Sequence, residues 1–272
     1  MKFKIGFHAD SSSTPADTRK NEPVNQITEI RKSLVEVYFP VRNRAYSYYN
    51  DRFDLHTGDN VYVEGKLEGL LGVVTNVNYN FKIKLSDYKR VISIVDTSVK
   101  GELFFADEAL LTFDRTVMPY EKVLSWFKAV TPDEEEIVSG NDNTSFPLEE
   151  IPCWPIEPEV MKRGFEYLKD DRVKYICVDN GQGKAIVVGS NVYEIEFTLN
   201  EGEISGLTCN CYCNGLCKHD AATLMFLKSM MDIIAEEYIE KFEESDYFAA
   251  VNKTAFYSFV VVDRKRGSFT LN

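Results

Sequence analysis

Residues 208–226 read TCNCYCNGLCKHDAATLMF and contain four of the six cysteines in the chain. One of its three histidines follows the last of these cysteines by two positions. The spacing is C-x-C-x5-C-x-H, and three thiolates with one imidazole make up a tetrahedral ligand set that zinc accepts in structural sites. The residues of this pattern are Cys209, Cys211, Cys217 and His219.

The local chain can bring these side chains to one point. Alternate residues of an extended segment project to the same side, so Cys209 and Cys211 can face a common ion. Asn214 and Gly215 can turn the chain back before Cys217, where apolar spacing predicts the start of a helix. The unpaired N–H groups and the dipole of a helix start favour thiolate charge. We therefore expect a closed, structural zinc site that fastens a strand end to a helix.

Other uses of the cysteines fit this pattern less well. Disulfides persist poorly in a reducing compartment, and two cysteines separated by one residue are badly placed to bridge each other. A Cys–His nucleophile pair needs one reactive thiol in a pocket rather than a group of thiols. The C-x-x-C spacing common in redox pairs occurs nowhere in the chain. No constellation of residues in the sequence indicates an enzyme.

The pattern and its surroundings resemble the SWIM zinc finger over about residues 160–228. The resemblance is carried by RGFEYLKDDRVKYI (163–176), IVVGSNVYEIEFTL (186–199) and the cysteine cluster. SWIM domains typically have an N-terminal helix, a strand pair with a Gly-Ser turn, a strand that enters C-x-C, and C-K-H opening a helix. By match of position, the resemblance implies that the metal ligands are Cys209, Cys211, Cys217 and His219.

The chain departs from the family after the second ligand, where Cys-Pro is common and Tyr212 and Cys213 stand here. Cys213 is either an exchange ligand or a thiol in a tight loop; we favour the loop thiol, but the second ligand stays open between Cys211 and Cys213. The family occurs in Swi/Snf-type helicase-like ATPases, Mutator-type transposases and other proteins. The resemblance therefore implies a module that binds DNA or protein and has no catalytic activity of its own.

The N-terminal half reads differently. Short runs rich in Val, Ile, Tyr and Phe predict strands at 33–41, 44–49, 59–65, 72–79, 81–85 and 90–96. Such a series favours a small antiparallel barrel. Within it, GDNVYVEGKLEGLLGVVTNV (58–77) resembles, more weakly, the Gly-bearing hairpin of KOW-like and other SH3-like barrels, which often bind nucleic acid or proteins.

Two stretches of this half, RNRAYSYYNDRF (42–53) and YNFKIKLSDYKR (79–90), interleave bases with aromatic residues. Exposed rings can stack on nucleic-acid bases while the cations contact phosphates. In an alternating strand, however, the rings face the core and the charges face solvent, which needs no ligand. A nucleic-acid face on this half would use Arg42, Arg44, Lys82, Lys84, Lys89 and Arg90.

We predict an α+β protein in which a small antiparallel, SH3-like barrel precedes a zinc-bound SWIM module of helix, antiparallel strands and a long helix. The predicted divisions are a β-rich barrel domain over 1–130 with a mobile loop at 10–26, an acidic linker over 131–150, and a SWIM domain over 151–272. The SWIM domain ends in a helical and strand extension. The linker carries seven acids and no base.

The individual elements follow from the same patterns. Helices are expected at 119–129, at about 158–169, and from Cys217 to about 244, the last of these with a break allowed. Further strands are expected at 173–179, 184–190, 192–200 and 255–263.

Charge and hydropathy limit the classes of partner that the protein can bind. The net charge is −12, with 18 basic and 17 acidic residues in 1–130 and 13 and 19 in 151–272, so neither part is basic enough for strong non-specific binding to phosphates. No apolar run is long enough to span a membrane, and the N-terminus lacks the apolar core of a secretory signal. We expect a cytoplasmic protein that binds DNA, RNA or a protein such as a helicase-like ATPase. A protein–protein adaptor without nucleic-acid affinity is the alternative.

Overall fold

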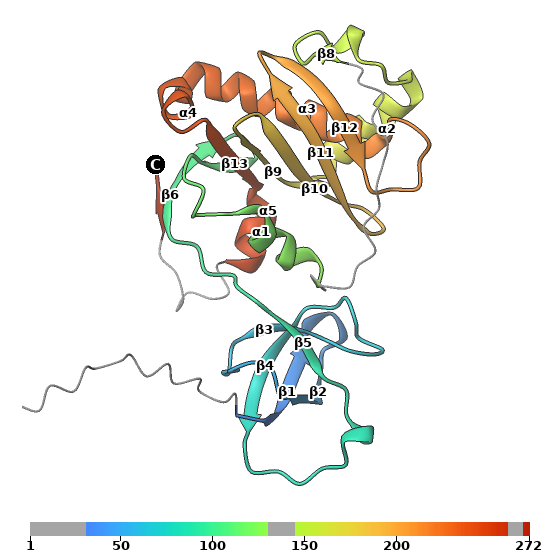
Figure 1. Ribbon diagram of the computed structural model, residues 1–272, viewed down its shortest axis with the longest axis vertical. Coiled ribbons are helices and arrows are strands. Elements are labelled where there is room, and N and C mark those ends of the chain that lie inside the picture. The colour runs from blue at the N-terminus through green and yellow to red at the C-terminus, as the bar shows by residue number, and fades with distance from the viewer. Residues whose placement is uncertain (1–30, 130–144, 261–268) are drawn as a thin grey trace, which may run out of the picture.

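The computed structural model describes residues 31–129, 145–260 and 269–272. Within these ranges the chain is a mixed α+β protein with two largely antiparallel sheets (Figure 1). The predicted mobile loop at 10–26 and most of the predicted acidic linker lie outside the described residues. No helix among the described residues is both long and apolar enough to cross a lipid bilayer.

The smaller sheet has five antiparallel strands in the order β2-β1-β4-β3-β5. They are β1 (Ser33–Phe39), β2 (Arg44–Asn50), β3 (Asn60–Val63), β4 (Gly72–Asn78) and β5 (Val91–Val95). Alternate residues of β1 point inward and form one apolar core with valines of β3, β4 and β5. The edge strands meet at one bridge, where the Tyr49 N–H donates to the Lys89 carbonyl at 2.9 Å. In the described residues no continuous ladder closes this sheet, so the SH3-like barrel remains a prediction.

Five of the six strands predicted in this half are confirmed, and the strand at 81–85 is wrong. That segment belongs to an excursion between β4 and β5 that includes a short 3-10 turn, η2 (Leu85–Asp87). Phe81 and Ile83 are half-buried and Lys82 and Lys84 exposed, so the alternation is real. Alternation alone makes no strand, because a strand also needs a neighbouring strand to accept its hydrogen bonds.

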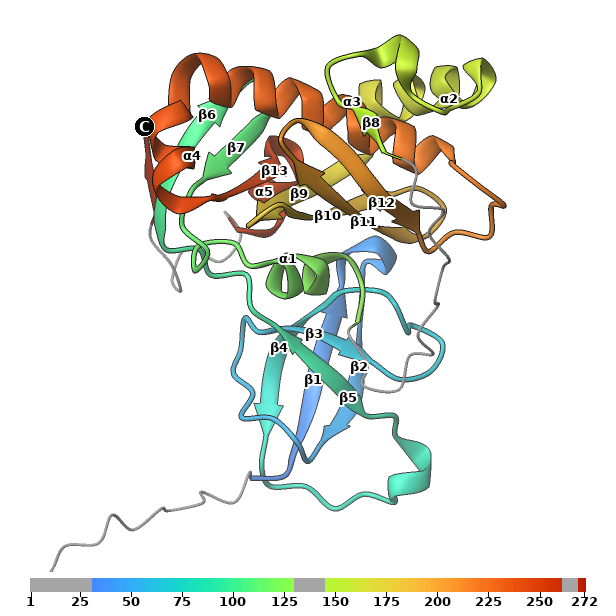
Figure 2. The same cartoon turned by 45° about the horizontal axis from the view of Figure 1, so that its top comes forward.

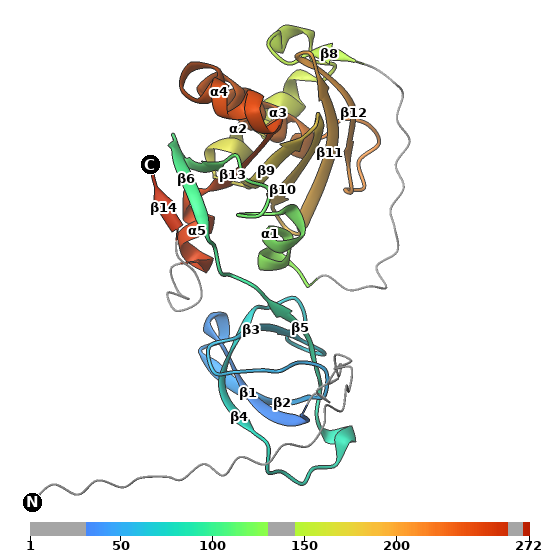
Figure 3. The same ribbon diagram turned by 60° about the vertical axis from the view of Figure 1, so that its left-hand side comes forward.

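The larger sheet has nine strands in the order β14-β6-β7-β13-β9-β10-β11-β12-β8. They are β6 (Gly101–Ala106), β7 (Ala109–Thr112), β8 (Phe146–Pro147), β9 (Val173–Asp179), β10 (Gln182–Val188), β11 (Val192–Asn200), β12 (Glu203–Cys209), β13 (Tyr247–Asn252) and β14 (Phe269–Leu271). Every pairing is antiparallel except that of β14 with β6, which lies at the C-terminal end of the chain (Figure 3).

Helices cover both faces of this sheet (Figures 1 and 2). One face carries α2 (Pro158–Lys169), α3 (Lys218–Ile233), the π-helical turn η4 (Ile234–Tyr238) and α4 (Ile239–Ser245); the other carries α1 (Tyr120–Phe127) and α5 (Lys253–Phe259). Strand β9 shows how one sequence serves both layers. Its Ile176 and Val178 enter the core under α3, while Tyr175 and Cys177 enter the core under α1.

Helix α1 joins the two sheets, as Figure 2 shows. Tyr62 and Val95 of the smaller sheet lie in the same buried cluster as α1 and the face of the larger sheet that α1 and α5 cover. The buried Trp126 donates its indole N–H to the Asp96 carbonyl at 2.9 Å, and its own carbonyl accepts from the Tyr62 hydroxyl at 3.2 Å. The two sheets therefore share one buried cluster, in addition to the separate core of the smaller sheet.

Two expectations about organisation are corrected here. Strands β6 and β7 fall inside the predicted 1–130 domain, yet β7 pairs with β13, far along the chain, and both strands belong to the larger sheet. The predicted strand at 255–263 is helix α5 over its described N-terminal part, because the Asn252 side chain caps a helix by accepting the Ala255 N–H at 3.1 Å. The predicted helices at 119–129 and 158–169 are confirmed, as is the broken helix after Cys217.

Candidate metal centre

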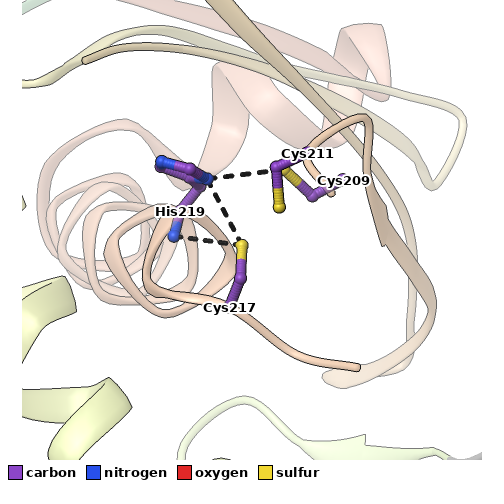
Figure 4. Close-up of side chains that lie close together, drawn as sticks. All are labelled: Cys209, Cys211, Cys217 and His219. Atoms are coloured by element: carbon purple, nitrogen blue, oxygen red, sulfur yellow. Dashed lines mark hydrogen bonds between the residues drawn. The ribbon is translucent and has the colours of Figure 1, made fainter. Parts of the chain in front are cut away.

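Four side chains from the end of β12 and the start of α3 converge in the region that Figure 4 shows. Each of them offers one ligand atom, and these atoms all lie within 4.8 Å of one another. The Nδ1 atom of His219 lies 3.4 Å from the sulfur of Cys217 and 3.7 Å from the sulfur of Cys209. The complete group is Cys209, Cys211, Cys217 and His219.

These separations fit a four-coordinate ion. Zinc–sulfur bonds of about 2.3 Å and zinc–nitrogen bonds of about 2.0 Å place sulfur and nitrogen about 3.5 Å apart in a tetrahedron. The two sulfur–nitrogen distances lie on either side of this value. Thiolates and imidazole are also the ligand types that structural zinc sites use. The group can therefore hold a metal ion without large rearrangement.

The C-x-C segment is held by the residue between its two cysteines. The Asn210 N–H donates to the Glu194 carbonyl at 3.2 Å, and the Asn210 side-chain oxygen accepts the Glu194 N–H at 3.1 Å. This pair continues the β11–β12 ladder one step beyond the pairing of Cys209 with Ile195. Both hydrogen bonds hold Asn210 against the backbone of β11, and its neighbours Cys209 and Cys211 face the candidate site.

Glu194 extends this anchor to the opposite side of the sheet. Its carboxylate accepts from the Tyr120 hydroxyl at 3.0 Å and pairs with the Lys128 ammonium at 2.8 Å. Both partners belong to α1 or to the residue that ends it. The strand that positions the first two cysteines is thus tied to the helix that joins the two sheets.

The first turn of α3 positions the other two candidate ligands. Cys217 is the N-cap, and its sulfur accepts the His219 N–H at 3.3 Å. The Asp220 carboxylate accepts the Cys217 N–H at 2.8 Å, which completes a capping box. The helix start thus satisfies its own N–H groups and holds the thiol and the imidazole together.

Helix α2 fixes where that turn lies. At Gly164 the two helices approach so closely that an added Cβ would lie 2.5 Å from the Cβ of Ala221 and 3.2 Å from the Lys218 carbonyl oxygen. Only a glycine allows this approach, because real Cβ atoms essentially never come within 3.0 Å of another residue's atoms. The small residues at the crossing therefore set the position of the candidate ligands on α3.

Burial shifts the protonation equilibria of the group in the absence of an ion. Burial raises the pKa of Cys211 to about 11. The hydrogen bond with the Cys209 thiol, together with burial, raises the pKa of Cys217 well above its ordinary value. Burial and the neighbouring Lys218 cation lower the pKa of His219 to about 4. A metal ion would supply the positive charge that these buried ligands need to become thiolates.

The structure groups Cys211 rather than Cys213 with the other three candidates. Cys213 is exposed and lies outside the group, as does Tyr212, whose relative exposure is 99%. All six cysteines lie in the described ranges, and none forms a disulfide. Sequence patterns did not single out Asn210 or the two tyrosines that contact the His219 ring, Tyr167 and Tyr193. Asp220 had a usable signal, since an acid three residues after an N-cap is typical of a capping box.

The basic residues predicted for a nucleic-acid face do not gather in one place. Arg42 and Arg44 lie at the β1–β2 turn. Lys89 and Arg90 lie beside Tyr49, five residues further along β2, which corresponds to about 17 Å of strand. Arg90 is also paired with Asp51 at 3.4 Å. The remaining two predicted bases, Lys82 and Lys84, are exposed in the excursion before β5.

Comparison with known proteins adds no assignment. No family model matches the chain, and no curated protein or solved structure matches it. The candidate site is therefore defined by its own ligand set and geometry.

Proposed function

We propose that this chain is a zinc-binding interaction module of the SWIM type, in which zinc is structural and the function is binding rather than catalysis. The observation that carries the proposal is the convergence of three sulfurs and one ring nitrogen, which all lie within 4.8 Å of one another. Four protein ligands close the coordination shell, whereas a catalytic zinc keeps one position for water or substrate. The ligands are Cys209, Cys211, Cys217 and His219.

The zinc ion would join the end of β12 to the start of α3. Binding energies of structural zinc sites are about 10–16 kcal/mol, comparable to or larger than the whole stability of a typical domain. Loss of the ion should therefore unfold the segment between the two elements, about 209–230. With zinc bound, the larger sheet and its helices would present the zinc loop, with the exposed Tyr212, to a partner.

The partner that we propose is nucleic acid, DNA or RNA, or a protein that works on it, such as a helicase-like ATPase. Support comes from the SWIM-like pattern and from exposed bases on the smaller sheet. The six unpaired cysteines support a reducing compartment, the cytoplasm. The alternative is an adaptor that binds only proteins. The net charge of −12 and the separation of the basic residues favour this alternative.

Elemental analysis of protein that was never exposed to a chelator tests the metal proposal. We expect one zinc per chain, and removal by a chelator should cost the helical signal of α3. Cys211→Ser and Cys213→Ser form a matched pair, because the two cysteines are two residues apart and differ in exposure. Only Cys211→Ser should lose zinc. Fully folded protein without metal would overturn the proposal.

A salt titration separates the two kinds of partner. Binding of single-stranded DNA, duplex DNA and RNA should be measured at low ionic strength and then at rising salt. A nucleic-acid binder must lose affinity steeply as salt rises, because cations on the protein displace counterions from phosphates. Arg44→Ala and Lys84→Ala test the two ends of the smaller sheet separately. No binding to any of the three at low salt would leave the adaptor.

A further inference from the structure

The imidazole of His219 lies between two tyrosine rings that come from different elements. Tyr193 of β11 stacks on it with ring centroids 3.8 Å apart and an interplanar angle of 19°. Tyr167 of α2 meets it edge-on at 5.4 Å and 63°. A histidine lone pair lies in the ring plane, so a metal ion can bind well only where that plane points. The stacked ring of Tyr193 restricts the plane directly.

The other nitrogen of the same ring makes this contact important. Nδ1 faces the sulfurs of Cys209 and Cys217, whereas Nε2 is buried and has no hydrogen-bond partner among the described residues. Metal-bound histidines almost always donate their second ring N–H to a carboxylate, carbonyl or water, which fixes the ring. Here no protein group in the described residues supplies that hydrogen bond, and the contacts that the protein makes to the imidazole include two aromatic rings.

The turn between β10 and β11 is built to keep both tyrosines in place. The Tyr193 hydroxyl lies 2.9 Å from the Ser190 hydroxyl. An added Cβ at Gly189 would lie 2.9 Å from the Tyr167 hydroxyl oxygen and 3.2 Å from a ring carbon of Tyr193. The Lys218 ammonium lies over the Tyr167 ring, 4.4 Å from its centroid. The absence of a side chain at Gly189 lets the two tyrosines approach the imidazole together.

We propose that Tyr193, supported by Tyr167, is a positioning residue of the metal centre. The two rings form an aromatic clamp that holds the His219 plane so that Nδ1 is the metal ligand, and the clamp replaces the usual hydrogen bond to the second nitrogen. This inference rests on the proposed metal-binding function. It adds the residues that set affinity without being ligands, and it assigns the coordinating nitrogen.

The test is metal affinity with a spectroscopic signature. Co²⁺ is titrated into metal-free protein, its visible ligand-field bands are recorded, and Zn²⁺ is then used to displace it. Tyr193→Leu should weaken Zn²⁺ binding by about 10–100-fold, as loss of an outer-shell partner does, and should change the Co²⁺ bands. Tyr193→Phe keeps the stacked ring and should retain both affinity and bands. Tyr212→Leu is the matched control on the exposed zinc loop and should behave as wild type.

The outcomes separate this inference from the proposed function. Wild-type protein that binds neither ion refutes the metal site itself. Wild-type protein that binds both, with Tyr193→Leu equally tight and spectrally unchanged, refutes the clamp alone. If Tyr193→Leu does not fold at saturating zinc, Gly189→Ala provides the second variant, because it keeps both rings and displaces them. Weaker binding by Gly189→Ala supports the clamp, and unchanged binding overturns it.

Discussion

The crossing of α2 over α3 allows a quantitative prediction for Gly164→Ala. The added Cβ would lie 2.5 Å from the Ala221 Cβ, 3.1 Å from the Ala222 nitrogen and 3.2 Å from the Lys218 carbonyl oxygen. Carbon atoms pack best at about 3.5–4.0 Å, so the helices must separate by about 1 Å. Two of the three neighbours are backbone atoms, which cannot rotate away. Such overpacking costs about 1–3 kcal/mol.

An opposing term must be subtracted. Alanine favours a helix interior by about 1 kcal/mol over glycine. The net loss in the free energy of unfolding should be about 0–2 kcal/mol at saturating zinc, which is the overpacking cost less the gain in helix propensity. Zinc affinity should fall as well, because Lys218 lies between Cys217 and His219 and moves with them. Urea denaturation and Co²⁺ competition measure the two effects.

Two further variants make the test sharp. Lys162→Ala, on the exposed side of α2, adds no contact at the crossing and should leave stability nearly unchanged. Ala221→Gly removes the nearest opposing atom, so the double variant with Gly164→Ala should recover part of the loss beyond additivity. If Gly164→Ala proves about 1 kcal/mol more stable than wild type, as alanine is at an open helix position, and binds zinc equally well, the close approach of the helices is refuted.

Three other predictions follow from the same contacts. Zinc binding near pH 7 should release about three protons, because free cysteine has a pKa of about 8.5. Burial raises the pKa of Cys211 further, and the hydrogen bond with Cys209 together with burial raises that of Cys217. Calorimetry in buffers of different ionisation enthalpy counts the protons, and fewer than two would contradict the thiol assignment. Gly183→Ala should destabilise the fold by about 1–3 kcal/mol through overpacking, since the Cβ would lie 2.1 Å from the Phe197 ring across the β10–β11 pair; equal denaturation midpoints would count against that packing. The pKa of His219 is lowered to about 4 by burial, below its ordinary value of about 6.5 in the unfolded chain, so the unfolded state takes up the proton first. Because loss of zinc frees the 209–230 segment, protonation of the His219 imidazole competes with the ion, so zinc affinity should fall as pH falls through about 6.5. Co²⁺ competition at several pH values measures this, and His219→Gln should flatten that part of the profile.

Local signals were enough for much of the secondary structure and for the ligand set. The Pro-started helix at 158–169 and the helix after Cys217 were predicted with nearly the bounds found, because periodicity and caps act within a few residues. The metal-ligand spacing is also a local property, and the structure brings all four predicted residues together. The π-helical turn η4 is the break that the prediction allowed in the long helix.

Pairing between distant strands could not be predicted in the same way. β6 (GELFFA) and β7 (ALLT) lack the Val, Ile and Tyr of the preceding strands, so the sequence patterns predict no strand there, and nothing local indicates that β7 pairs with β13. For the same reason the alternation at 81–85 predicts a strand, although no neighbouring strand among the described residues pairs with it. Strand partners are set by which apolar faces can be buried together, and that depends on the whole chain.

The sequence by itself determined the ligand set of the candidate centre, since the three thiols and the imidazole that could hold a metal ion lie close together in the chain. Only the tertiary structure decided how the centre is held: Asn210 on β11, Gly164 against α3, and the tyrosines on either side of His219. Ligand identity is carried by single residues close together in the chain. Ligand orientation is carried by contacts between elements, and those contacts exist only once the sheet and its helices have packed.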